Sequence, residues 1–145
     1  MQHISTCPIK FKNSLSTNDV VLYLGHARSG GGPDFTLPVL NKNNHVDYGY
    51  YKVHKPGLTS LISGLSSTNP KVLGILACKS TGLFSGTLKK YLPHSTLITA
   101  DELFDYNDIL PTGLNIIEAV AQQSCNMNFE KIIMNSLNSD TLTVF

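Results

Sequence analysis

Charge is scarce in this sequence of 145 residues. Only 14% of the residues are charged and the formal net charge is +1, whereas charged residues make up about a quarter of a typical soluble domain. The longest run of basic residues is the pair Lys89 and Lys90. A nucleic-acid-binding protein needs a basic face that displaces counterions from phosphates. The sequence therefore predicts no nucleic-acid partner.

Cysteines and long apolar runs are also few. The three cysteines, Cys7, Cys78 and Cys125, form no CxxC pair, which argues against a disulfide scaffold or a structural zinc site. No window approaches the ~18 apolar residues of a membrane-spanning helix. The first residues, MQHISTCPIKFKNS, lack the apolar core of a secretory signal. We expect a cytoplasmic chain with reduced thiols and no membrane partner.

Apolar residues make up 41% of the chain, enough for a single domain over residues 1–145. Short, continuous, β-rich runs predict strands that are buried on both faces. These predicted strands cover residues 20–24, 72–77, 95–100 and, at the end of the chain, 142–145.

Helical spacing of apolar residues alternates with these strands. It predicts helices over 58–65, 82–91, 112–124 and 127–137, with Ser80 or Thr81 capping the second. The inner face of the third is expected to hold Leu114, Ile117, Val120 and Ala121. Residues 28–38 and 101–111 are expected to be loops, and 45–53 a short hairpin or an edge strand. This alternation predicts an α/β fold, a mostly parallel sheet with helices on both faces.

Two chemically active side chains follow neighbouring strands of this predicted sheet. His26 follows the first strand after Gly25, and Cys78 directly follows the second. The carboxyl ends of parallel strands share one edge, so both residues should lie on one rim. An imidazole beside a cysteine favours the nucleophilic thiolate and can protonate a leaving amine.

The turns after the two strands also free backbone N–H groups. Those of Ala27 and Cys78 are candidate donors to a developing oxyanion, and the following helix would favour a thiolate at its start. A plainer interpretation stays open. Cys78 is then an inert core thiol and His26 an ordinary turn residue.

The two segments VVLYLGHA and VLGILACKS resemble the signature of the caspase-like (clan CD) cysteine peptidases. In that family one apolar strand ends in His-Gly and another in Ala-Cys, and in caspases the histidine lies about fifty residues before the cysteine, as His26 does here. The resemblance covers residues 19–100. It implies a caspase-like fold and hydrolysis of a peptide or protein substrate without cofactor or metal, with Cys78 as nucleophile and His26 as general acid/base.

Two departures from the family matter. Ala27 stands where the family has glycine, which keeps the N–H but adds a methyl group. Only about twenty residues precede the first predicted strand, whereas the family begins with an extra strand and helix. The chain is then a reduced form, a form truncated at its N-terminus, or a fragment whose sheet a partner domain or chain completes. A catalytically inactive caspase-like scaffold or interaction module is the alternative.

The remaining polar residues have weaker assignments. Arg28 and Asp34 lie in a glycine-rich loop that is expected to be flexible and to face substrate, and they are candidate substrate contacts or else solvated loop charges. A small-ligand domain with these glycines at a switch point is a further interpretation. Asp101 follows the third strand on the same rim and, with Glu102, would suit a substrate with Arg or Lys before the scissile bond; the alternative is that these two acids only begin an exposed loop. His45, His54 and His94 lack the spacing of metal ligands.

Overall fold

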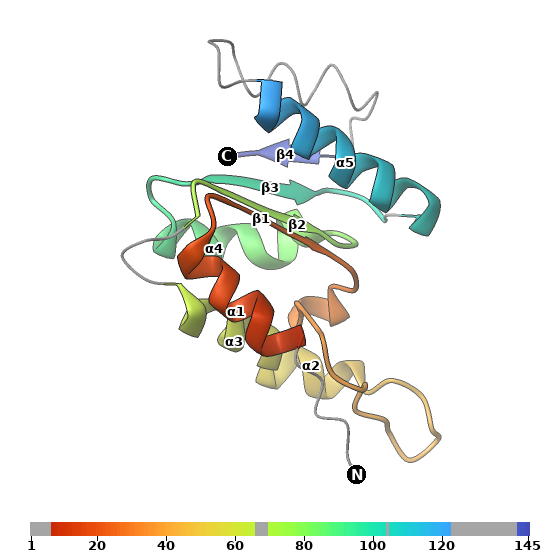
Figure 1. Cartoon of the computed structure of the whole chain (residues 1–145). Helices are drawn as coiled ribbons and strands as arrows, with labels where there is room; N and C mark the ends of the chain where they lie inside the picture. Colours follow the sequence, from red (N-terminus) through yellow and green to blue (C-terminus); the bar gives the residue numbers. More distant parts are fainter. Residues whose placement is uncertain (1–6, 66–69, 104, 123–141) are drawn as a thin grey trace.

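The computed structural model describes residues 7–65, 70–103, 105–122 and 142–145 (Figure 1). Four strands, β1 (Val20–Leu24), β2 (Val72–Leu76), β3 (Thr96–Ala100) and β4 (Leu142–Val144), form one sheet in the order β1-β2-β3-β4. The first three are parallel and β4 is antiparallel to β3. The predicted mostly parallel α/β sheet is therefore confirmed, with each strand at or within a residue of its expected bounds.

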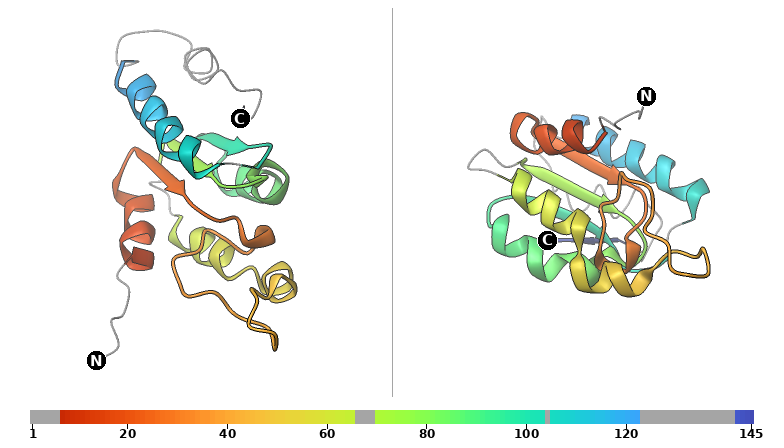
Figure 2. Two further views of the ribbon diagram at one scale, coloured as in Figure 1. Left: turned by 90° about the vertical axis from the view of Figure 1, so that its right-hand side faces the viewer. Right: turned by 90° about the horizontal axis from the view of Figure 1, so that it is seen from below.

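Helices cover both faces of the sheet, as expected. Alternate residues of the strands form two cores. Leu73 and Ile75 pack with residues of α1 (Cys7–Thr17), α3 (Pro56–Gly64) and α4 (Gly86–Tyr91). Leu76 and Ile98 face the opposite side and pack under α5 (Tyr106–Gln122). Figures 1 and 2 show α5 on its own side of the sheet and α1, α3 and α4 on the other.

For residues 45–53 the expectation of a short hairpin or an edge strand is largely wrong. A single bridge joins Leu40 to Val46, and the chain then enters the helix α2 (Tyr48–His54). The side chain of Asp47 caps this helix by accepting a hydrogen bond from the Tyr50 N–H at 2.9 Å. Tyr51 anchors the helix because this residue is only 2% exposed.

The helix α5 begins at Tyr106, so part of the expected loop 101–111 is helical and Pro111 lies within the helix. Its inner face also differs from the expected one. Of the four residues expected there, Val120 packs against the core, whereas Leu114 and Ile117 are 56% and 52% exposed and Ala121 is also exposed. The buried positions are Ile109, Thr112, Gly113, Ile116 and Ala119. The helix carries two apolar stripes, and spacing alone does not show which of them faces the sheet. The expected helix 127–137 lies outside the described residues.

None of the helices in the described ranges combines the length and the apolar character required to cross a membrane.

Candidate active site

His26 and Cys78 leave the sheet side by side. Leu24 at the end of β1 is in register with Leu76 at the end of β2, and the Gly25 N–H donates to the Leu76 carbonyl at 3.2 Å. The turns that carry the histidine and the cysteine therefore begin next to each other. Both residues line one cavity of about 450 Å³, a size within the usual range of ligand sites.

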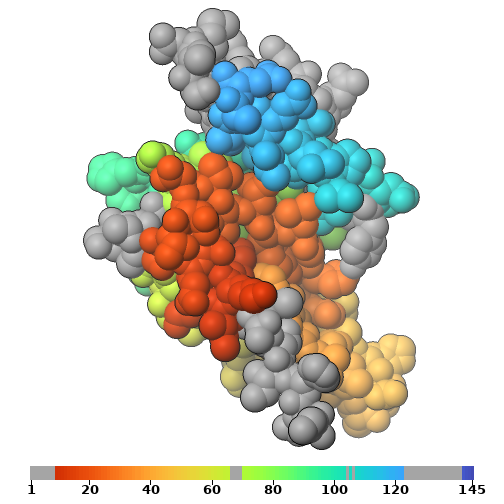
Figure 3. Space-filling view, viewed as in Figure 1, coloured from red at the N-terminus to blue at the C-terminus, as the bar shows by residue number. Residues whose placement is uncertain are grey.

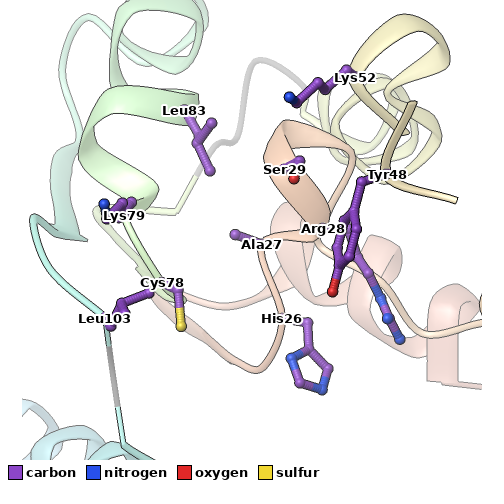
Figure 4. Close-up of a pocket in the computed structure, with 10 residues that line it drawn as sticks. All are labelled: His26, Ala27, Arg28, Ser29, Tyr48, Lys52, Cys78, Lys79, Leu83 and Leu103. Atoms are coloured by element: carbon purple, nitrogen blue, oxygen red, sulfur yellow. The ribbon is translucent and has the colours of Figure 1, made fainter. Parts of the chain in front are cut away.

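Four segments form the cavity, since Leu103 from the chain after β3 also lines it (Figure 4). The β1 exit and the turn after Cys78 lie on opposite sides, and α2 contributes part of the wall. His26 is exposed and Cys78 is partly buried. Besides these two residues the lining comprises Ala27, Arg28, Ser29, Tyr48, Lys52, Lys79, Leu83 and Leu103.

The backbone of His26 is held from below by a buried tyrosine. The Tyr23 hydroxyl donates to the His26 carbonyl at 3.0 Å and accepts from the Asp34 N–H at 2.9 Å. Glycines permit this close packing. A Cβ at Gly25 would lie 2.6 Å from the Tyr23 hydroxyl, and one at Gly32 would lie 2.6 Å from the His26 carbonyl oxygen. The position of the histidine thus depends on contacts that larger residues would disrupt.

The two candidate substrate contacts of the glycine-rich loop bind each other. Arg28 Nε lies 2.9 Å from Asp34 Oδ2, and the two side chains are only 15% and 6% exposed. Arg28 lines the cavity, whereas Asp34 is not among its lining residues. The three glycines of the loop are buried, and a Cβ at Gly31 would lie 2.6 Å from Tyr51. The loop packs against α2, so these glycines do not form an open cradle for a phosphate or a substrate.

The turn that carries Cys78 is tied to β3 by Ser80. This serine is fully buried. Its hydroxyl donates to the Ile75 carbonyl at 2.6 Å and accepts from the Ala100 N–H at 2.8 Å. The Lys79 N–H also donates to the Glu102 carbonyl at 2.9 Å. The expectation that Ser80 or Thr81 caps the following helix is wrong, because the Thr81 hydroxyl instead pairs with that of Thr99.

Backbone strain gathers around the cavity. Arg28, Ser29 and Lys79 line it and have φ values of 45°, 51° and 54°. This left-handed backbone conformation costs residues other than glycine about 1–2 kcal/mol. The chain after Cys78 also begins with a π-helical turn, Thr81–Ser85, before α4. Both features are often found at functional sites.

Asp101 lies away from this cavity. Its Oδ2 accepts a hydrogen bond from the Thr143 hydroxyl of β4 at 2.5 Å, and neither Asp101 nor Glu102 is a lining residue. The lining instead carries the cationic side chains of Arg28, Lys52 and Lys79. The structure therefore does not bring the expected acidic group to the pocket.

Two lining residues, Tyr48 and Lys52, were not predicted from the sequence. Tyr48 and Lys52 are one helical turn apart, a spacing that would have placed them together if 48–54 had been assigned as a helix.

His45, His54 and His94 are exposed. Within the described ranges no group of three or more His, Cys, Asp or Glu side chains is placed to hold a metal ion.

Comparison with known proteins gives no relative, since no family model, curated protein or solved structure matches this chain.

Replacing Ser80 with alanine should lower the free energy of unfolding by about 1–3 kcal/mol, because the buried Ala100 N–H loses its acceptor. Urea unfolding followed by circular dichroism measures the change. Ser85→Ala is the matched control, since that hydroxyl bonds a carbonyl at a partly buried position and its loss should cost less than about 1 kcal/mol. Equal costs for the two variants would contradict the role given to Ser80.

Burial raises the pKa of the Tyr23 hydroxyl above its usual value. The folded chain therefore holds this proton at pH values where the unfolded chain has begun to lose it, so stability falls as the pH rises above about 10. Tyr23→Phe removes this contribution. Between about pH 8 and about pH 10.5, the free energy of unfolding should fall more for the wild type than for the variant. Parallel losses in the two proteins would show that Tyr23 does not contribute.

Proposed function

We propose that this chain is a caspase-like cysteine peptidase domain that hydrolyses peptide bonds through Cys78 and His26. One observation carries the proposal. A thiol and an imidazole come from the exits of two adjacent parallel strands and line the same cavity. The short signature around each residue and the strained backbone beside them add support.

The chemistry follows the usual course of a thiol peptidase. His26 takes the proton of the Cys78 thiol, and Sγ attacks the carbonyl carbon of the scissile bond. The backbone N–H groups of Ala27 and Cys78 are the candidate donors to the oxyanion. His26 then gives its proton to the leaving amine, and the C–N bond breaks. A water molecule that His26 deprotonates hydrolyses the thioester and returns the thiol.

The charges of the cavity bear on substrate choice. Cleavage after Arg or Lys required an acid on the rim, and Asp101 is engaged with Thr143 instead. Lys52 and Lys79 line the cavity, and cationic side chains favour an acidic partner. Among peptides that end in Asp, Asn, Arg or Lys before a fluorogenic group, we expect the Asp peptide to be cleaved fastest.

The decisive experiment compares the wild type with Cys78→Ala on this peptide panel. Removal of the nucleophile should reduce kcat/KM at least about a thousandfold. Cys7→Ala is the matched control and should retain full activity. Iodoacetamide at a limiting dose should label Cys78 before Cys7 or Cys125.

Cleavage that survives in Cys78→Ala would contradict the proposal. A folded wild type that cleaves no peptide and leaves Cys78 unlabelled would favour the alternative, an inactive caspase-like scaffold. Ala27 is the feature that points that way, since it adds a methyl group beside His26, at a position only 5% exposed.

A further inference from the structure

The strand β1 forms one end of the sheet. In the part of the chain that the structure describes, β2 is its single neighbour. Its sequence, Val-Val-Leu-Tyr-Leu, carries no charge and no proline. Proteins usually protect an open edge with such residues or with a bulge, because exposed backbone groups recruit another strand. β1 has none of these devices.

Hydrogen bonds at both ends of β1 show which of its backbone groups face outward. The Asp19 carbonyl accepts from Val72 and the Gly25 N–H donates to Leu76, so these groups point toward β2. Backbone direction alternates along a strand in step with the side chains. The N–H and C=O groups of Val20, Leu22 and Leu24 therefore point away from β2.

The side chains of the same three residues border an apolar groove of about 590 Å³ beneath α5. The helix contributes one stripe to it, in which Leu110, Leu114 and Ile117 are 60%, 56% and 52% exposed. Figure 3 shows the orange β1 segment at the surface between α1 and α5. The groove is lined by Val20, Leu22, Leu24, Leu110, Gly113, Leu114, Ile117, Val120 and Ala121, all of them uncharged.

We propose that this surface binds a second copy of the chain, with β1 antiparallel to its counterpart and a two-fold axis at Leu22. In this register Leu22 exchanges both backbone hydrogen bonds with Leu22 of the second copy. Val20 does the same with Leu24 of the second copy, and Leu24 with Val20. Every outward N–H and C=O of β1 is then paired, and the two sheets become one.

The strand is suited to pairing with itself. The residues of β1 on both sides of Leu22 are apolar, so no two like charges face each other across the two-fold axis. The nearest charge, Asp19, would face Gly25 of the second copy and already lies 3.3 Å from the Lys71 ammonium.

The apolar groove favours a second copy of the chain over an unrelated strand as the partner of β1. The same two-fold axis brings the stripe of α5 toward its counterpart above the joined strands, so the backbone edge and the apolar groove are covered together. A foreign strand would pair with the edge of β1 but would bring no second α5 stripe to face Leu114 and Ile117. A second copy brings a matching apolar stripe to the groove, and removal of apolar surface from water is the main favourable term in such association.

A charge-swap experiment tests the register. By sedimentation equilibrium the wild type should have twice the 15.8 kDa of one chain. Leu22→Lys and Leu22→Glu should each be monomeric, because like charges meet on the axis. An equimolar mixture of the two variants should recover the dimer, since each pair then joins Lys to Glu. Leu37→Lys, at a loop position 92% exposed, is the control and should stay dimeric.

Circular dichroism checks that each variant is folded. A wild type that stays monomeric across the concentration series would overturn the proposal. So would dimers of both single variants, since the interface would then lie elsewhere. Failure of the mixture of folded variants to recover the dimer would overturn the placement of the axis at Leu22.

Discussion

The parallel pairing of β1 with β2 is the interaction on which the site depends. Their register sets Leu24 beside Leu76, so the chain leaves both strands at one level and delivers His26 and Cys78 to one cavity. A slip by one residue would move the histidine relative to the cysteine and turn the buried side chains of β1 to the wrong face. The two cores on opposite faces of the sheet prevent this, because Val21 and Tyr23 pack on the α1 side while Val20 and Leu22 face α5.

Contacts beneath the cavity hold the two turns that carry His26 and Cys78 in place. Tyr23 holds the His26 carbonyl, the glycine-rich loop donates two N–H groups to the carbonyl of Ala27, and Ser80 joins the turn of Cys78 to the end of β3. The proposed peptidase chemistry would need His26 and Cys78 held to within about half an ångström of the productive geometry. These contacts act on backbone atoms, so they fix where the two turns that carry His26 and Cys78 lie. The strained residues Arg28, Ser29 and Lys79 lie on the same turns.

The strands and the shared rim of His26 and Cys78 followed from the sequence because buried parallel strands are short apolar runs whose exits lie at one edge. Three features did not follow. α2 lacks a strong apolar stripe, and the capping Asp47 was the signal that was missed. The two apolar stripes of α5 look alike in sequence. The pairing of Arg28 with Asp34 and the bridging role of Ser80 are tertiary contacts, which spacing along the chain does not encode.

The most direct measurement is a crystal structure of the protein after reaction with a peptide aldehyde. We expect a bond between Cys78 Sγ and the aldehyde carbon, with a ring nitrogen of His26 within hydrogen-bond reach, about 2.6–3.2 Å, of the adduct. The oxygen of the adduct should face the N–H groups of Ala27 and Cys78. An aldehyde that leaves Cys78 unmodified, or an imidazole separated from the adduct by a packed side chain, would contradict this expectation.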